Sequence, residues 1–325
     1  MSALLEVSDL SVSIGATRLV QDVSFSLEES SALGLVGESG SGKTLTLRAL
    51  LGLDPRGARV TGSVMFAGEQ LVGRGERAMS RLRGAQLAMV FQDPMAALNP
   101  VQRIGKQIAE GPRLHLGLGR AEAAARTLEL LAKVGLPDPA ATARRYPHQL
   151  SGGQRQRAMI AIALACEPKV VLCDEPTTAL DVTVQAQVLR LLHSACSELG
   201  AALLFVSHDL AVVRQLCRQV AVMYAGRVVE SGPIEEVFGR PRHGYTASLL
   251  RSLPDVDAPS EPQPIPGEPA NPRNPPPGCP FHPRCDYALP DCATERPELV
   301  EVMVGRRSAC VHGRTGLPEL ERMAR

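Results

Sequence analysis

The sequence lacks the features of a membrane-spanning or secreted chain. No stretch of its 325 residues approaches the roughly 18–20 consecutive apolar residues that a transmembrane helix needs. The longest candidate, Ala158–Cys173, is interrupted by Glu167-Pro168-Lys169. The first residues contain neither a basic segment nor a long apolar one, so we expect no secretory signal. If the chain works at a membrane, we expect it to do so through a partner.

Excess charge of either sign is also missing. The 35 basic and 34 acidic residues leave a net charge of +1, whereas a nucleic-acid-binding protein needs a basic face. We therefore expect no nucleic-acid partner. Apolar residues make up 44% of the chain and charged residues 21%, which is ordinary for a soluble globular protein with a sizeable core.

Strand-like and helix-like patterns alternate over residues 1–240, which is typical of an α/β domain. The expected strands are Leu4–Ile14, Val23–Leu27, Ala32–Val36, Leu87–Phe91, Val170–Asp174, Ala202–Ser207 and Val220–Tyr224. The expected helices are Lys43–Leu51, Ala121–Val134, Ser151–Ala165 with Ser151 as its cap, and Val182–Leu199. Because the pattern is mainly helical over about residues 93–168, we expect a helical insertion between two core strands there.

The composition changes after residue 240. Ten prolines fall between Pro254 and Pro277, and such a segment cannot pack a core, so 254–277 is interpreted as an extended linker. The cysteine-bearing segment 278–312 follows. We therefore divide the chain into a domain of residues 1–240 and a C-terminal extension of residues 241–325.

A glycine-rich motif follows the expected strand Ala32–Val36 and opens the expected helix at Lys43. It matches the phosphate-binding pattern G-x-x-x-x-G-K-[ST], with the residues Gly37, Glu38, Ser39, Gly40, Ser41, Gly42, Lys43 and Thr44. Glycines let successive N–H groups turn toward phosphate oxygens, and the helix N-terminus adds partial positive charge. Lys43 is expected to reach the β- and γ-phosphates of ATP, and the Thr44 hydroxyl to bind Mg²⁺.

Two carboxylates follow the apolar run Val170–Cys173. Ligands bind beyond the carboxyl ends of strands in a parallel sheet, so Asp174 is expected to hold Mg²⁺ through water and Glu175 to polarise the attacking water. A polar strand end is common, and alone this pattern is weak. Together with the phosphate-binding loop, it favours a nucleotide hydrolase.

A second candidate anion site is the segment Leu150-Ser-Gly-Gly-Gln154. Ser151 and the amides of Gly152 and Gly153, with Gln154 behind them, would open a helix whose N-terminus can hold a γ-phosphate. This pentapeptide beside a P-loop resembles the signature of ABC-type ATPases. The resemblance implies a RecA-like P-loop core with an antiparallel β subdomain, an inserted helical subdomain and a small cysteine-rich C-terminal extension.

The resemblance also assigns roles to three further residues. Gln92 resembles the Q-loop glutamine, which senses Mg²⁺ and water; Asp181 resembles the D-loop aspartate; and His208 resembles the switch histidine at the γ-phosphate. In this family, two ATP molecules lie between two ATPase domains, each bound by the P-loop of one domain and the signature of the other. The chain carries one of each, so a second ATPase chain, a related one, is implied.

Three segments are similar to the dipeptide, oligopeptide and nickel importer branch: Phe91–Pro100, Tyr146-Pro-His-Gln149 and His243–Pro254. The similarity implies peptide import, with nickel or another small solute as the alternative. It further implies two transmembrane permease subunits, an extracytoplasmic substrate-binding protein and a peripheral position at the cytoplasmic face of the inner membrane.

Four cysteines near the C-terminus are similar to the C-terminal motif of the same branch. Cys279, Cys285, Cys292 and Cys310 have the spacing C-x5-C-x6-C-x17-C, and four thiolates can hold a [4Fe–4S] cluster or Zn²⁺. Zinc sites usually contain C-x2–4-C pairs, which this segment lacks, so the spacing favours the cluster. Four reduced thiols in a disordered tail remain the alternative.

The alternative functional classes are a soluble ABC ATPase and a binding module. Soluble ABC ATPases that act on ribosomes or DNA carry two ATPase domains or a long coiled coil between the motifs. Here the P-loop and the signature lie about a hundred residues apart, with no heptads between them. A binding module with an inactive nucleotide site is disfavoured by the intact Lys43, Glu175 and His208.

Overall fold

The computed structural model describes residues 3–178, 180–252 and 263–318. The chain divides into two compact units. The unit that we call the helical unit comprises Met1–Ala3, Leu27–Ser31 and Gly73–Val206. The unit that we call the P-loop unit comprises Leu4–Ser26, Ala32–Val72 and Ser207–Arg325.

Parallel strands form the core of the helical unit. They are β6 (Leu87–Val90), β7 (Val170–Asp174) and β8 (Ala202–Ser207). In register, Val90 lies opposite Cys173, and Cys173 lies opposite Phe205. All residues of β7 and β8 are buried, which is why their sequences are almost entirely apolar.

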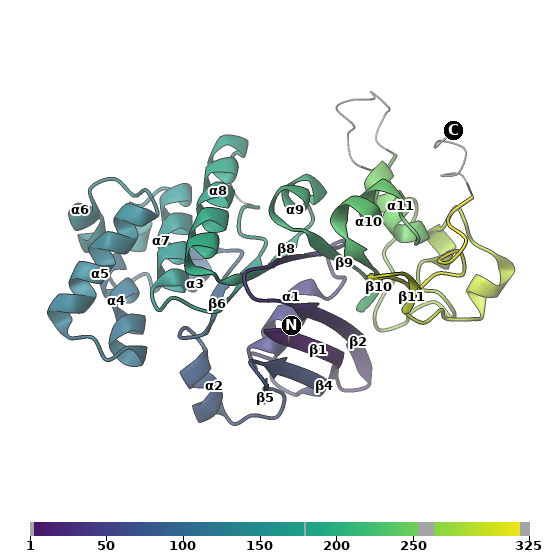
Figure 1. Cartoon of the computed structure of the whole chain (residues 1–325), viewed down its shortest axis with the longest axis horizontal. Coiled ribbons are helices and arrows are strands. Elements are labelled where there is room, and N and C mark those ends of the chain that lie inside the picture. Colours follow the sequence, from purple (N-terminus) through teal and green to yellow (C-terminus); the bar gives the residue numbers. More distant parts are fainter. Residues whose placement is uncertain (1–2, 179, 253–262, 319–325) are drawn as a thin grey trace. The chain divides into compact units, whose positions relative to one another are not determined.

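Helices occupy most of the remaining helical unit (Figure 1). They are α2 (Glu76–Leu82), α3 (Pro94–Ala97), α4 (Ile104–His115), α5 (Arg120–Lys133), α6 (Pro139–Arg144), α7 (Gly152–Leu164) and α8 (Val182–Leu199), with the 3₁₀-helix η1 (Pro147–Gln149). Five of these, α3 to α7, fall within residues 93–168, which confirms the predicted helical character of this segment. The predicted helix 121–134 corresponds to α5, which begins and ends one residue earlier.

The P-loop unit contains an antiparallel sheet near its N-terminus. Its strands lie in the order β2 (Thr17–Leu27), β1 (Leu5–Ile14), β4 (Ala58–Phe66) and β5 (Glu69–Gln70). A bulge interrupts the pairing of β1 with β4 between Ser8 and Ser11. Gly62 is required opposite this bulge, since a Cβ there would lie 2.4 Å from the Asp9 carbonyl oxygen.

A second set of strands in this unit runs in the order β3 (Ala32–Val36), β9 (Gln219–Tyr224), β10 (Arg227–Pro233), β12 (Arg306–Ser308) and β11 (Val300–Met303). Strands β3 and β9 are parallel, whereas the later pairs are antiparallel. The helices of the unit are α1 (Lys43–Leu50), α9 (Leu210–Leu216), α10 (Ile234–Gly239) and α11 (Gly244–Arg251). Strands β11 and β12 thus extend the sheet of β3, β9 and β10.

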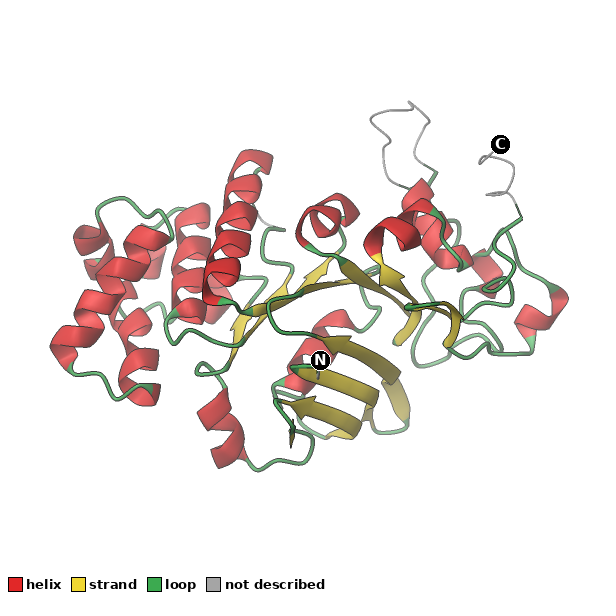
Figure 2. Ribbon diagram, viewed as in Figure 1, coloured by secondary structure: helices red, strands yellow, loops and turns green. Residues whose placement is uncertain are grey.

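Most of the described residues after α11 lie in loops and short 3₁₀-helices (Figure 2). The 3₁₀-helices are η2 (His282–Arg284) and η3 (Pro290–Ala293). Residues 263–277 of the predicted linker form neither a helix nor a strand, while residues 254–262 lie outside the described part. No helix within the described residues is long and apolar enough to cross a membrane.

Candidate functional site

The predicted phosphate-binding loop lies in the P-loop unit between β3 and α1. Gly37 and Gly42 have φ angles of 150° and 103°. A Cβ on Gly37 would lie 2.2 Å from the Met223 carbonyl oxygen of β9. Close backbone approach and left-handed backbone therefore demand glycine at these two positions.

Lys43, the first residue of α1, is only 5% exposed. Its Nζ donates hydrogen bonds to the carbonyl oxygens of Gly37 at 2.8 Å and Glu38 at 2.9 Å, so the ammonium group is held inside the curve of the loop. Thr44 follows in the first turn of α1. A lysine ammonium at a helix N-terminus within a glycine loop forms a cation-rich site for phosphate oxygens.

His208 belongs to the same unit and precedes α9. Asp209 caps α9, since its Oδ1 accepts hydrogen bonds from the N–H groups of Ala211 and Val212. Ser207 Oγ accepts a hydrogen bond from the Asp209 N–H at 3.0 Å. These bonds fix the backbone on the C-terminal side of His208, whose side chain is exposed.

The other predicted nucleotide-site residues lie in the helical unit. Asp174 ends β7 and is 4% exposed. Glu175 follows with a left-handed φ of 44°, and its N–H donates to the Val206 carbonyl oxygen at 3.0 Å. Thr178 Oγ1 lies 3.1 Å from Glu175 Oε2 and donates to it. Because β6 and β7 are parallel, Gln92 follows β6 at the same sheet edge as this carboxylate pair.

The segment 150–154 forms the N-terminus of α7, as predicted. Ser151 Oγ accepts a hydrogen bond from the Gln154 N–H at 3.3 Å, and Gln154 Oε1 accepts one from the Ser151 N–H at 3.1 Å. This reciprocal pair is a capping box. A Cβ on Gly153 would lie 2.7 Å from Val184 Cγ1 of α8, so the contact between the two helices requires glycine.

Asp181 serves as the N-cap of α8. Its Oδ1 accepts a hydrogen bond from the Val184 N–H at 3.0 Å. The predicted D-loop aspartate and the signature serine therefore share one structural role, because each begins a helix of the helical unit. Ala179, two residues before Asp181 in the D-loop motif, lies outside the described residues.

Sequence reasoning missed two residues that contact the phosphate-binding loop. Arg284 of η2 forms an ion pair with Glu38, with Nη1–Oε2 and Nη2–Oε1 distances of 2.8 and 3.0 Å. The Tyr245 hydroxyl accepts a hydrogen bond from the Glu38 N–H at 2.7 Å. These residues lie 246 and 207 positions from Glu38, and no local pattern indicates such contacts.

The four C-terminal cysteines lie in the P-loop unit. Burial raises the pKa of the Cys285 thiol to about 12, with smaller contributions from the charges of Cys310, Cys279 and Cys292. Among residues 3–178, 180–252 and 263–318, no group of three or more His, Cys, Asp or Glu side chains is arranged to hold a metal ion. The structure gives no support to the predicted iron–sulfur or zinc site.

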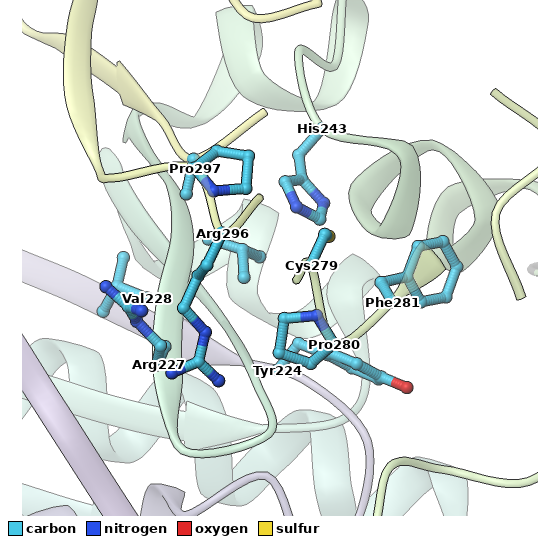
Figure 3. A pocket seen from close by; sticks show the side chains of 11 residues that line it. Tyr224, Arg227, Val228, His243, Cys279, Pro280, Phe281, Arg296 and Pro297 are labelled. Atoms are coloured by element: carbon cyan, nitrogen blue, oxygen red, sulfur yellow. The ribbon is translucent and has the colours of Figure 1, made fainter. Parts of the chain in front are cut away.

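A small pocket borders this region (Figure 3). Its lining includes Tyr224, Arg227, His243, Cys279, Phe281 and Arg296. His243 is 2% exposed, and burial lowers its pKa to about 4, so its imidazole is neutral near pH 7. Its Nδ1 accepts a hydrogen bond from the Tyr245 N–H at 3.0 Å, which makes His243 the N-cap of α11.

Comparison with known proteins agrees with this geometry. Residues 20–178 match the ABC transporter family, and residues 229–292 match the C-terminal region of oligopeptide/dipeptide transporters. A putative peptide import ATP-binding protein of Brucella abortus is 49% identical over 94% of this chain and 94% of its own length. An oligopeptide transport ATP-binding protein, OppD of Escherichia coli, is 45% identical over 95% of this chain and 93% of its own length.

Solved structures give the same result for the fold. A dimeric ATP-binding cassette with ADP and Pi, in a post-hydrolysis state, has a TM-score of 0.64 at 26% identity. The match covers 71% of this chain and 98% of that one. A component of an ABC transporter complex from Clostridium perfringens has a TM-score of 0.63 at 26% identity and covers 74% and 92% of the two chains. The chain belongs to the ATP-binding subunits of ABC transporters and is an ATPase of their oligopeptide and dipeptide transporter branch.

Proposed function

We propose that the chain binds MgATP on the loop 37–44 and hydrolyses it to drive the import of peptides. The observation that carries this proposal is the conformation of the loop, with Lys43 Nζ held by the Gly37 and Glu38 carbonyls at the N-terminus of α1. Residues 1–240 would form the ATPase domain and residues 241–325 its C-terminal extension.

The residues of the proposed site have distinct tasks. Lys43 and the loop amides would bind the phosphates, Glu175 would polarise the attacking water, and His208 would contact the γ-phosphate. Thr44 and Gln92 would supply oxygen ligands of the kind that Mg²⁺ prefers, and Asp174 would hold the ion through water. When bound, Mg²⁺ supplies positive charge that neutralises the phosphate oxygens.

Replacement of Lys43 by alanine tests the loop assignment. We expect ATP affinity to fall by more than about tenfold, since a buried charge-assisted contact to phosphate is lost. Binding of a fluorescent ATP analogue in the presence of Mg²⁺ measures this. Lys106→Ala, a lysine of α4 in the helical unit, is the control and should bind ATP normally. Unchanged affinity in the Lys43 variant would contradict the assignment.

We propose further that two ATPase chains enclose ATP between the Lys43 loop of one and the Ser151 loop of the other. The dimeric form of the ADP- and Pi-bound cassette supports the pairing of two ATPase chains. Closure of the pair would move two permease subunits, and hydrolysis would open it again. The second chain would be a related ATPase, with a second copy of this chain as the alternative.

The names of the relatives support peptide as the cargo. The chain would then lie at the cytoplasmic face of the inner membrane, and an extracytoplasmic substrate-binding protein would deliver the peptide. Uptake of labelled dipeptides and oligopeptides by cells with and without the gene tests this. Loss of nickel uptake with normal peptide uptake in the deletion strain would favour the alternative cargo.

We propose that Cys279, Cys285, Cys292 and Cys310 bind a [4Fe–4S] cluster rather than Zn²⁺. Support comes from the spacing of these cysteines in the sequence. Among the described residues, no group of side chains is already arranged to hold a metal ion. The four thiols would therefore have to rearrange around the metal. A bound cluster would staple a segment that is poor in apolar side chains.

Metal content tests this proposal. Protein purified without oxygen is expected to be brown and to contain about four iron atoms per chain. Cys285→Ser should lose most of the iron, whereas Cys217→Ala, which alters a buried core cysteine of the same unit, should retain it. Zinc without iron in the anaerobic protein would overturn the assignment, as would protein that contains neither metal.

A further inference from the structure

Glu38 of the phosphate-binding loop is held by residues of the C-terminal extension through both its side chain and its backbone. The two Arg284 nitrogens meet the two carboxylate oxygens in parallel, at 2.8 and 3.0 Å. The Tyr245 hydroxyl accepts a hydrogen bond from the Glu38 N–H at 2.7 Å. A bidentate arginine–carboxylate pair fixes orientation as well as distance.

Arg284 is itself immobilised before it reaches the loop. Its side chain is 5% exposed, its Nε donates to the Pro266 carbonyl oxygen at 2.8 Å, and its Nη1 donates to the Tyr224 hydroxyl at 3.3 Å. The guanidinium carbon also lies 5.8 Å from the centre of the Phe281 ring. The Arg284 guanidinium group is therefore preorganised, and little side-chain entropy is lost when it binds the Glu38 carboxylate.

Tyr245 is equally constrained. It is fully buried, and its ring lies 4.6 Å from that of Tyr224 and 5.3 Å from that of Phe281. The chain has only four tyrosines and six phenylalanines, and three of these ten aromatic residues pack together behind the phosphate-binding loop. The aromatic cluster thus fixes the position of the hydroxyl group that caps the Glu38 amide.

The negative charge of Glu38 affects nucleotide binding. Glu38 places a carboxylate within a loop whose ligand would carry several negative charges, and an unpaired carboxylate there would repel the phosphates. The Glu38 side chain is 23% exposed, so its carboxylate is not shielded from phosphates bound in the loop. Pairing with Arg284 removes the net charge without removing the side chain.

We propose that Arg284 and Tyr245 are positioning residues for nucleotide binding: Arg284 neutralises Glu38, and Tyr245 fixes its peptide group. The C-terminal extension thereby maintains the phosphate-binding loop in the conformation and charge state that bind ATP. This inference rests on the proposed assignment of the loop 37–44 as the phosphate site.

The test compares Arg284→Gln with the double variant Glu38→Gln/Arg284→Gln. We expect Arg284→Gln to raise the Kd and KM for MgATP about tenfold with kcat changed less than about twofold, because the unpaired carboxylate opposes phosphate binding. The increase should be larger at low ionic strength, where repulsion is less screened. The double variant, which removes both charges, should recover most of the lost affinity.

The matched control is Arg214→Gln. Arg214 forms an equally bidentate pair with Glu235, at 3.1 and 2.6 Å, but this pair is exposed and joins α9 to α10. The Arg214→Gln variant should change neither the Kd nor the KM for MgATP. If Arg284→Gln does not fold, Tyr245→Phe replaces it, since only one hydroxyl group is lost; we expect about a threefold increase in Kd.

Two results would overturn the inference. One is normal ATP affinity in Arg284→Gln, or in Tyr245→Phe where that variant is used. The other is a double variant as impaired as the single one, since Arg284 would then act only in packing the extension. The Lys43→Ala variant separates the two proposals. If Lys43→Ala binds ATP normally, the loop assignment itself fails. If Lys43→Ala loses ATP binding but Arg284→Gln binds ATP normally, only the present inference fails.

Discussion

Replacement of Glu175 by glutamine is expected to lower the ATPase turnover number about a thousandfold while ATP still binds. A glutamine side chain has nearly the same shape, but its amide cannot accept a proton from the attacking water, and a positioned base contributes roughly 10²–10⁴-fold. Glu175 is suited to this task because its backbone is tied to Val206 and its Oε2 accepts a hydrogen bond from Thr178. These contacts orient the carboxylate at the end of β7.

The measurement is phosphate release by the complete transporter supplied with MgATP, together with the mass of the purified ATPase assembly. Because the variant cannot complete hydrolysis, ATP should accumulate and keep two ATPase chains associated. Glu129→Gln, on the exposed surface of α5, is the control and should hydrolyse ATP normally. Wild-type turnover in the Glu175 variant, or an assembly mass that ATP does not alter, would count against the proposed role.

The second large effect concerns stability rather than catalysis. Glu230 of β10 and Arg306 of β12 form an ion pair with an Nη2–Oε1 distance of 2.7 Å, and their side chains are 0% and 2% exposed. The Glu230 carboxylate also accepts hydrogen bonds from the N–H groups of Arg242 and His243. Burial raises the pKa of Glu230, and the contact with Arg306 opposes this change. This buried pair joins β12 to β10.

Arg306→Met is expected to lower the free energy of unfolding of the P-loop unit by about 3–5 kcal/mol, because it leaves a carboxylate buried without its cation. Urea unfolding monitored by circular dichroism measures the change. The double variant Glu230→Met/Arg306→Met removes both charges and should be more stable than Arg306→Met. A loss below about 1 kcal/mol in the single variant would show that the pair is not needed.

Local features of the fold could be predicted from the sequence because their determinants are contiguous. Ala32–Val36 and the glycine loop after it predict a strand, a turn and a helix, and all three are present. Ser151 predicts a helix start because its hydroxyl accepts a hydrogen bond from the N–H of Gln154, only three residues further along the chain. In both cases, hydrogen bonds and steric demands act within a few residues, so the pattern of the sequence contains them.

Other elements escaped prediction for physical reasons. Strand β4 (Ala58–Phe66) carries arginine, threonine and the glycine opposite the β1 bulge, which weaken its apolar alternation. Strand β2 begins at Thr17, six residues before the predicted start at Val23. The contacts of Glu38 with Arg284 and of Glu230 with Arg306 join residues 246 and 76 positions apart. Nothing in the local sequence of either partner specifies the other.

The central proposal, that ATP lies between the Lys43 loop of one chain and the Ser151 loop of another, can be tested by photocleavage with vanadate, an analogue of the γ-phosphate. The transporter is assembled with Lys43→Ala in this chain and an unaltered second ATPase. Illumination after vanadate trapping, followed by mass spectrometry, identifies the cleaved loops. We predict that this chain loses cleavage in the loop 37–44 and retains it at Ser151, because Ser151 serves the nucleotide of the other chain. Simultaneous loss of cleavage at both loops, or cleavage that never occurs at Ser151 even in the unaltered transporter, would contradict the account.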